Sequence, residues 1–293
     1  NYSGSTSGTF VITKAAATPV LPGNTAAQGT IGENITYTVT TGIPDGASVP
    51  ANFKIADAIA TARSTYQAGS LAVTLNGSPL PGTWSTSEVA STPTVTAPAA
   101  GYTASGGDTT IVMTFVARIA DVAANVRTAA TGVTNTATST WTDPVIGAQT
   151  RNSAQTSVQI VEPLITQAKT DNVNPSRVIP DQIVTYTLTT TNSSATRVST
   201  AYDTTIVDHV PAGLTPIDVA PGNLPLADGA IVPGTTSAVW NQAARTTTRT
   251  GVDIAPNSNV AMTYRVRVDN PAVAGNTLTN SVTATTTSMS GVV

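Results

Sequence analysis

Apolar and polar residues alternate with a period of two along several stretches of this chain. In residues 260–268, valine, methionine and tyrosine alternate with alanine, threonine and arginine, and residues 111–119 repeat the pattern. Residues 36–40 place a tyrosine and a valine between threonines. This period is that of a β-strand with one buried and one solvated face. Turn sequences at 44–46 and 76–77 separate such runs, so we expect many short antiparallel strands and no long helix.

The chain contains an internal repeat. Residues 36–40 (Thr-Tyr-Thr-Val-Thr) match residues 185–189 (Thr-Tyr-Thr-Leu-Thr), and Met-Thr-Phe at 113–115 matches Met-Thr-Tyr at 262–264 with the same spacing. We therefore predict two copies of one module, residues 1–161 and residues 162–293, the first with longer loops. The strand pattern predicts an all-β fold of two tandem immunoglobulin-like antiparallel β-sandwich domains.

Composition excludes several classes of function. Charged residues make up 10% of the 293 residues, against roughly 25% in a typical soluble domain. The absence of cysteine excludes disulfides and thiolate metal sites, and a single histidine excludes a multi-histidine metal centre. A net charge of −3 without a basic run argues against nucleic-acid binding. No apolar run is long enough to span a membrane. We expect no metal and no cofactor.

Two of the three lysines occupy equivalent places near the start of each copy. Lys14 and Lys169 each follow an isoleucine on the same face of their predicted strands, so both should point inward, where a lone charge is unfavourable. The third lysine, Lys54, should lie on the face opposite Asp57 and is set aside.

An acid and an asparagine accompany each inward lysine. Asp57 and Asp208 each follow an isoleucine by two positions, which places them on the apolar face. Asn135 and Asn280 each follow an apolar residue by two positions, and we expect both on the last strand of their copy. Each copy thus brings one lysine, one aspartate and one asparagine to its interior in the same order.

This set of side chains can form an amide cross-link. A neutral lysine amine can attack the asparagine carboxamide while a protonated aspartate polarises the carbonyl, and ammonia leaves. An apolar interior favours the neutral forms of both the amine and the acid. The reaction occurs once, so Asp57 and Asp208 would act in self-modification without turnover. The alternatives are a buried Lys–Asp ion pair and lysines that reach solvent from strand ends.

The second copy resembles the DUF-eleven repeat family of prokaryotic surface proteins. The resemblance is carried by Lys-Thr-Asp at 169–171, Pro-Asp at 180–181, Thr-Tyr-Thr at 185–187, Ile-Val-Asp-His-Val-Pro-Ala-Gly-Leu at 206–214 and Leu-Thr-Asn at 278–280. The first copy matches more loosely. The resemblance implies tandem β-sandwich modules of large extracellular proteins, each with an intramolecular isopeptide bond: Lys14 to Asn135, and Lys169 to Asn280.

Two functions remain open at this point. The first is a structural module of an extracellular surface stalk, fibre or adhesin, whose partners are neighbouring repeats or subunits. Residues 1–10 could then add a strand to a neighbour's sheet. The second is a ligand-binding adhesin tip that recognises a host protein or a glycan through the loops of the first copy. An enzyme with turnover is not expected, because no reactive constellation exists beyond the two internal ones. No sortase-type signal is present in this sequence, so we expect surface anchoring to lie elsewhere or to be of another kind.

Overall fold

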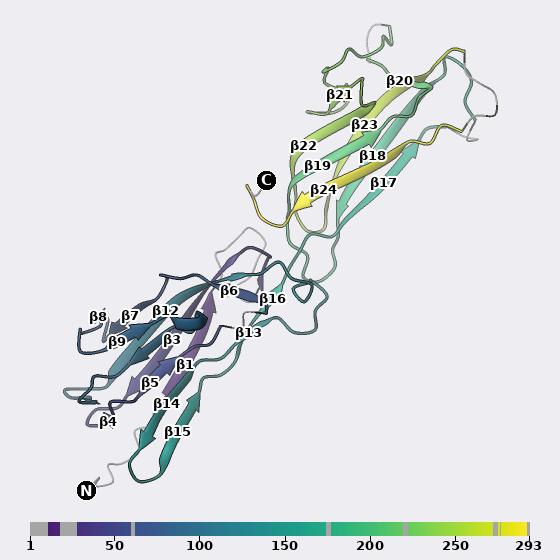
Figure 1. Ribbon diagram of the computed structural model, residues 1–293. Helices are drawn as coiled ribbons and strands as arrows, with labels where there is room; N and C mark the ends of the chain where they lie inside the picture. The colour runs from purple at the N-terminus through teal and green to yellow at the C-terminus, as the bar shows by residue number, and fades with distance from the viewer. Residues whose placement is uncertain are drawn as a thin grey trace. The chain divides into compact units, whose positions relative to one another are not determined.

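The computed structural model describes residues 11–17 (backbone only), 28–59, 62–173, 177–218, 222–271, 275 and 277–291. It divides into two compact units, Asn1–Val161 (unit 1) and Glu162–Val293 (unit 2) (Figure 1). Apart from one 3₁₀ turn at Val89–Ser91, the regular elements of the described residues are strands. The expected all-β class is confirmed.

Unit 1 is built from two main sheets. The first contains, in order, β1 (Val11–Ala17), β3 (Asn34–Ile43), β12 (Thr109–Ile119), β7 (Ala72–Leu75) and β8 (Ser78–Pro79), with β6 (Ser64–Tyr66) also paired to β12. The second contains β15 (Gly147–Asn152), β14 (Thr138–Asp143), β5 (Lys54–Ala56), β10 (Thr94–Thr96) and β9 (Ser85–Ser87). Two small sheets complete the unit: β11 (Tyr102–Thr103) with β4 (Ser48–Val49), and β13 (Val133–Asn135) with β16 (Thr156–Ile160) and β2 (Gln28–Gly29).

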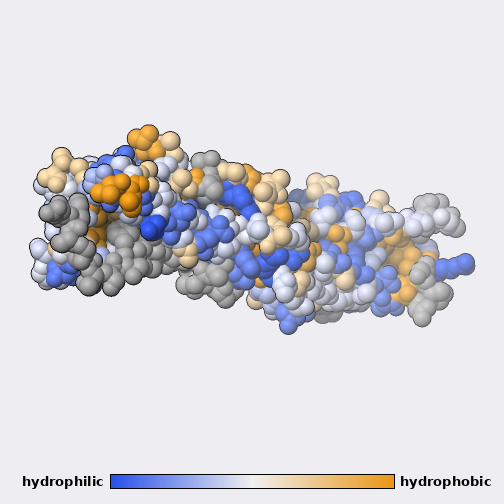
Figure 2. All heavy atoms as spheres, turned by 90° about the horizontal axis from the view of Figure 1, so that it is seen from below, coloured by the Kyte–Doolittle hydropathy of each residue, from blue (hydrophilic) through white to orange (hydrophobic). Residues whose placement is uncertain are grey.

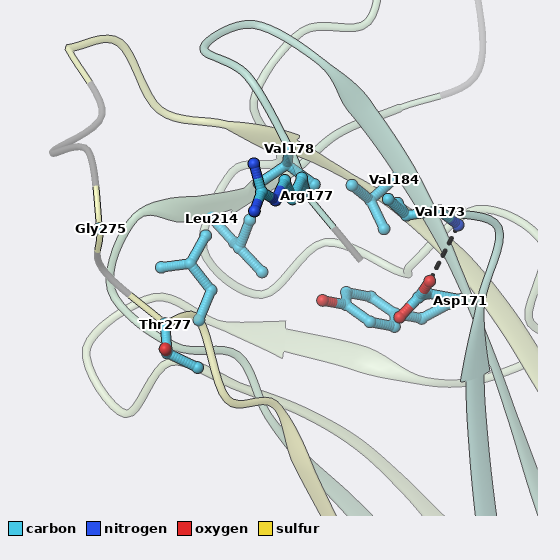
Figure 3. Close-up of a pocket in the computed structure, with 10 residues that line it drawn as sticks. Asp171, Val173, Arg177, Val178, Val184, Leu214, Gly275 and Thr277 are labelled. Carbon is cyan, nitrogen blue, oxygen red and sulfur yellow. Dashed lines mark hydrogen bonds between the residues drawn. The ribbon is translucent and has the colours of Figure 1, made fainter. Parts of the chain in front are cut away.

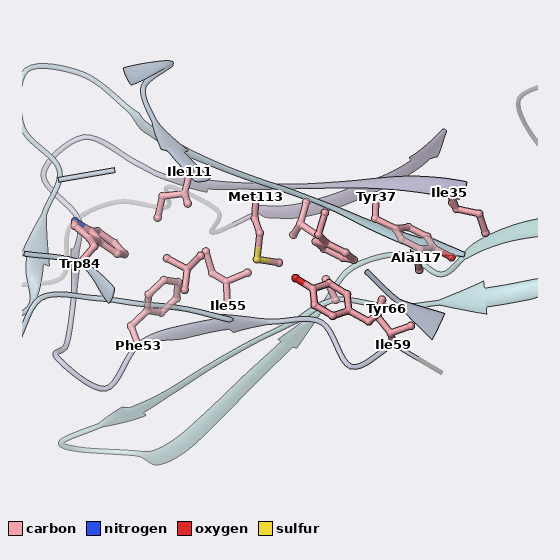
Figure 4. Close-up of a cluster of buried hydrophobic side chains, with 14 of the residues drawn as sticks. Ile35, Tyr37, Phe53, Ile55, Ile59, Tyr66, Trp84, Ile111, Met113 and Ala117 are labelled. Carbon is pink, nitrogen blue, oxygen red and sulfur yellow. The ribbon is translucent and has the colours of Figure 1, made fainter. Parts of the chain in front are cut away.

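Alternating side chains from the two main sheets form the core of unit 1. Tyr37 of β3 and Phe115 of β12 are fully buried, with ring centroids 5.6 Å apart. Ile55 of β5 and Val95 of β10 enter the same core from the second sheet. Figure 4 shows side chains from the two layers pointing toward one another. Threonines on the other face of β3 remain partly exposed, so the period-two pattern separates core from solvent.

Unit 2 is a sandwich of two four-stranded sheets. One contains β17 (Ile165–Asp171), β18 (Ile183–Asn192), β23 (Ser258–Val268) and β20 (Leu214–Pro216). The other contains β21 (Val239–Asn241), β22 (Thr246–Ile254), β19 (Ala201–His209) and β24 (Ser281–Thr287). Leu188, Met262, Tyr264, Val266 and Trp240 are among the residues buried between them.

The two units share the strand register of the predicted repeat. Lys14 pairs with Val39, and Lys169 pairs with Leu188. In both units, the residue opposite the lysine lies two positions after the tyrosine of the Thr-Tyr-Thr segment. The backbone therefore places the two lysines at equivalent positions of their first sheets.

The expectation that both asparagines lie on last strands is wrong. Asn135 ends β13, and three further strands follow it in unit 1; Asn280 lies immediately before β24. The Asn135 side-chain oxygen accepts a hydrogen bond from the Thr136 backbone N–H at 2.9 Å. After residues 136–137, the chain leaves the small sheet of β13 and enters β14, which pairs with β5 in the second main sheet.

Exposed apolar side chains are scattered over the surface. On the face seen in Figure 2, hydrophobic residues form separate small patches among hydrophilic ones. The most exposed large apolar side chains include Val145 and Ile146 in the turn between β14 and β15 and Val89 in the 3₁₀ turn. Single exposed apolar residues are normal on soluble domains. No helix in the described part of the chain has the length and apolar character of a membrane span.

Candidate functional site

Four polar side chains meet in the interior of unit 2. The Lys169 amine donates a hydrogen bond to Asp208 Oδ1, and the Tyr264 hydroxyl donates to Asp208 Oδ2. The Asn280 Nδ2 amide donates to the same Tyr264 hydroxyl at 3.0 Å. Lysine and asparagine are thus the two ends of one hydrogen-bonded chain that passes through the acid and the tyrosine. We call Lys169, Asp208, Tyr264 and Asn280 the unit 2 cluster.

Strand periodicity brings the cluster together from both sheets. Asp208 lies two residues after buried Ile206 on β19 and is itself fully buried, while the neighbouring His209 is exposed. Lys169 projects from β17 with its side chain 12% exposed. Asn280 lies next to β24, whose Thr283 pairs with the residue before Asp208. Antiparallel pairing of β24 with β19 therefore fixes the asparagine beside the acid.

Two tyrosine rings enclose the Lys169 amine. Tyr186 and Tyr264 are paired residues on β18 and β23, with ring centroids 5.8 Å apart. The Lys169 Nζ atom lies 4.5 Å from the Tyr186 centroid and 5.9 Å from the Tyr264 centroid. The rings offer the amine a weakly attractive π face.

Burial favours the neutral forms of the lysine and the two tyrosines. Desolvation lowers the pKa of the Lys169 amine, although its hydrogen bond and ion pair with Asp208 oppose the shift. Desolvation raises the pKa of the Tyr264 hydroxyl, and the Asp208 charge raises it further. The pKa of Tyr186 is raised by desolvation and then by the Asp171 charge. The lysine is thus closer to a free amine than an exposed lysine, and the tyrosines keep their protons.

The Asn280 carboxamide is held by one end. Its Nδ2 atom contacts Tyr264, whereas its buried Oδ1 atom has no hydrogen-bond partner among the described residues. A buried carbonyl oxygen without a donor is unfavourable, and a protonated aspartate or an amine could satisfy it. Amine, acid and carboxamide in one desolvated site are the groups that amide exchange requires.

Unit 1 repeats the acid and the asparagine. Asp57 is fully buried and Asn135 is 7% exposed. Thr138 of β14 pairs with the residue before Asp57, and Thr283 of β24 pairs with the residue before Asp208. Asn135 lies three positions before Thr138, and Asn280 lies three positions before Thr283. The asparagines therefore occupy equivalent register positions.

The lysines of unit 1 differ in what the structure describes. Lys14 occupies the register position of Lys169 on β1, but its side chain lies outside the described residues. Lys54 is exposed on β5, on the face opposite buried Asp57. Burial raises the pKa of Tyr37, and the charge of Asp57 contributes to the shift, so this tyrosine lies near the unit 1 acid.

Sequence reasoning did not identify the two tyrosines of the unit 2 site. Tyr264 was recognised only as one apolar-face position of a strand. Its hydroxyl is a polar group on that buried face, and a buried tyrosine hydroxyl usually needs a partner. This was the signal available in the sequence. The partners come from β19 and the segment before β24, which local patterning does not reveal.

A hollow of about 700 Å³ lies beside the cluster in unit 2. Its lining includes Arg177, Val184 and Leu214 (Figure 3), and also Leu278. Tyr186 also lines it, so the hollow reaches one of the two rings that enclose the Lys169 amine. Among the described residues, no group of three or more histidine, cysteine, aspartate or glutamate side chains could hold a metal ion.

Comparison with known proteins gives structural likeness without sequence relatives. No family model matches the chain, and no curated protein matches it in sequence. The Bacillus cereus major pilin subunit BcpA, as a D312A variant, is similar with a TM-score of 0.45 and 13% identity, over 97% of this chain and 67% of that chain. The C-terminal domain of the Streptococcus agalactiae AgI/II polypeptide BspA is similar with a TM-score of 0.47 and 12% identity, over 89% of this chain and 92% of that chain.

A third structure, the Corynebacterium diphtheriae major pilin SpaA, gives a TM-score of 0.35 and 17% identity. The match covers 96% of this chain and 62% of that chain. The solved structure of SpaA points to a modular pilus assembly with stabilising isopeptide bonds in that protein. Likeness at these scores leaves function to be argued from the site itself.

Proposed function

We propose that the chain is a structural module of an extracellular surface fibre or stalk, and that each unit is cross-linked by a Lys–Asn isopeptide bond. The unit 2 cluster carries this proposal. A lysine, an acid and an asparagine that are distant in sequence share one buried hydrogen-bonded chain. The resemblance to the DUF-eleven family, which rests on the sequence motifs alone, points the same way.

Bond formation follows from the chemistry of these groups. The desolvated Lys169 amine attacks the Asn280 Cγ atom, Asp208 as a neutral acid supplies the proton that the departing nitrogen takes up, and ammonia leaves. Folding replaces a bimolecular encounter by fixed proximity, which lowers the barrier by up to about 7–11 kcal/mol in well-oriented cases. In unit 1, we assign the same roles to Lys14, Asp57 and Asn135.

A simple ion pair explains the site less well. Burying Lys169 and Asp208 together loses hydration that their attraction only partly restores. A pair alone also gives no reason for a carboxamide whose buried oxygen has no partner among the described residues. The alternative of a lysine that reaches solvent from a strand end does not fit Lys169, because its amine forms an ion pair with a fully buried aspartate.

The bond would make the module resistant to force. In unit 2, it joins β17 to the residue before β24 and shields the chain between them from tension. The unit 2 cluster favours the structural role over the ligand-binding alternative, because its groups are joined inside the unit, where a bond between them would carry load.

Single-molecule stretching tests this function. Wild-type chains pulled from their ends should not release residues 169–280, whereas Asn280→Ala chains should release an additional length of roughly 370–400 Å, at about 3.3–3.6 Å per residue. The exposed Asn259 provides the control substitution, Asn259→Ala, which should extend like the wild type. Equal extension of wild type and Asn280→Ala would contradict a load-carrying cross-link.

A further inference from the structure

We propose that the Tyr264 hydroxyl relays a proton to the departing Asn280 nitrogen when the unit 2 cross-link forms. This inference rests on the cross-link proposed above and assigns it a further catalytic residue. Expulsion of nitrogen from a tetrahedral intermediate requires a proton donor in contact with that nitrogen. Tyr264 is the hydrogen-bond partner of Asn280 Nδ2 in the unit 2 cluster, at 3.0 Å.

The hydroxyl also contacts the source of the proton. The Tyr264 hydroxyl is hydrogen-bonded to Asp208 Oδ2, while the Lys169 amine is hydrogen-bonded to the other oxygen, Oδ1. The carboxyl group therefore has one oxygen facing the attacking amine and one facing the relay. Tyr264 is fully buried on β23, so its hydroxyl is held in this position by the packing around its ring.

The step balances without any outside reactant. The neutral Lys169 Nζ atom forms a bond to Asn280 Cγ, and the carbonyl electrons move to Asn280 Oδ1. In the resting cluster Asn280 Nδ2 donates to Tyr264 and Tyr264 donates to Asp208, so both hydrogen bonds reverse once the tetrahedral nitrogen has a lone pair that can accept. The Oδ1 atom of Asp208 takes the proton that Nζ sheds, and its Oδ2 atom passes the acid proton to the Tyr264 oxygen. The Tyr264 hydroxyl proton moves to Nδ2, the Cγ–Nδ2 bond breaks with its electron pair on nitrogen, and the carbonyl re-forms. The products are one amide, one ammonia, a neutral acid and a neutral tyrosine.

Unit 1 offers a natural comparison. Phe115 pairs with Tyr37 on β3 as Tyr264 pairs with Tyr186 on β18, so phenylalanine occupies the relay position. The Asn135 Nδ2 atom is buried and has no hydrogen-bond partner among the described residues, in contrast to Asn280. The unit 1 bond should therefore form more slowly than the unit 2 bond.

The test follows the full chain through timed cell-free synthesis. Samples are quenched in acid denaturant and digested, and the ammonia loss is measured separately for peptides joined across each unit. Tyr264→Phe should slow the unit 2 bond on the order of 100-fold, the lower end of general acid catalysis. Tyr202→Phe, which changes a buried tyrosine of unit 2 outside the cluster, should leave the rate unchanged.

The pH profile separates a relay from mere positioning. The ionisable groups in and beside the cluster are Lys169, Asp171, Tyr186, Asp208 and Tyr264, from β17, β18, β19 and β23. The wild-type rate should rise with pH as the amine loses its proton and then level off. Without the relay, the departing nitrogen depends on solvent acid, so the Tyr264→Phe rate should fall again at alkaline pH. A Tyr264→Phe rate lowered by one constant factor at every pH would overturn the relay.

A reciprocal variant keeps the inference testable if Tyr264→Phe fails to fold. Phe115→Tyr restores the hydroxyl in unit 1 and should shorten the half-time of that bond by about 10-fold or more. An unchanged half-time would count against the relay. Absence of any ammonia loss in the wild type would refute the cross-link itself. A normal wild-type loss that Tyr264→Phe matches in rate would refute only the relay.

Discussion

Removal of the Asn280 carboxamide should destabilise unit 2 by an amount that the position of the cross-link determines. A bond between Lys169 and Asn280 closes a loop over residues 169–280. The chain-entropy relation for cross-links then gives a stabilisation of about 5 kcal/mol at 25 °C, by analogy with a disulfide of the same loop length. An unfolding entropy of about 2.1 cal/mol/K per residue over unit 2 converts this to a Tm decrease of about 15–20 °C for Asn280→Ala.

The assay is differential scanning calorimetry of the full chain. The transition of unit 2 should move to lower temperature in Asn280→Ala while the transition of unit 1 stays in place. The Lys169–Asp208 and Tyr264–Asp208 hydrogen bonds do not involve the removed group, so the shift reports mainly the bond. The exposed-site variant Asn259→Ala should change the free energy of unfolding by less than about 0.5 kcal/mol. A Tm for Asn280→Ala within about 2 °C of the wild type would refute the reasoning.

Three further predictions concern unit 2. Asp208→Asn keeps the shape of the side chain but removes the acid, so the unit 2 cross-link should not form in this variant. Peptide masses should then lack the loss of roughly 17 Da, one ammonia, that the wild-type unit 2 shows. In the uncross-linked Asn280→Ala variant, burial lowers the pKa of Lys169 below its ordinary 10.5, so Lys169 binds more protons in the unfolded state and stability should rise with pH. The rise should end near pH 10.0, where tyrosines of the unfolded state ionise while Tyr186 and Tyr264 of the folded state keep their protons; urea unfolding that shows stability falling between pH 8 and pH 10, about the onset of lysine titration, would contradict this account. Gly234 has φ +85°, and an added Cβ would lie 2.6 Å from the Thr263 carbonyl oxygen. Gly234→Ala should therefore lower the free energy of unfolding in urea by about 2 kcal/mol. An unchanged unfolding midpoint would argue against this strain.

Local patterning predicted the parts of the fold that depend on one strand at a time. The alternation at residues 260–268 predicts β23, and the same pattern at 111–119 predicts β12. The inward position of Asp208 follows from the isoleucine two residues earlier. Such features need only the two-residue period of a strand and a hydrophobic interior.

Features that depend on pairing between distant strands were not predictable in this way. Asn135 and Asn280 have similar local sequence contexts. Three strands nevertheless follow Asn135 in unit 1, whereas only β24 follows Asn280 among the described strands. The place of Tyr264 in the cluster also depends on Asp208, which β19 brings across the sandwich from the opposite sheet. A hydroxyl on an apolar face indicates that a partner is needed, but only the packed sheets identify it.

The most direct test of the central claim is the intact mass of the denatured full chain. Each isopeptide bond releases one ammonia, so two bonds should lower the mass by about 34 Da from the value calculated from the sequence. A Lys14→Ala, Lys169→Ala double variant should show no such loss after correction for the substitutions. A deficit of about 17 Da would limit the bond to one unit, which we expect to be unit 2. A wild-type mass equal to the calculated value would contradict the cross-link, and with it the load-bearing role of the module.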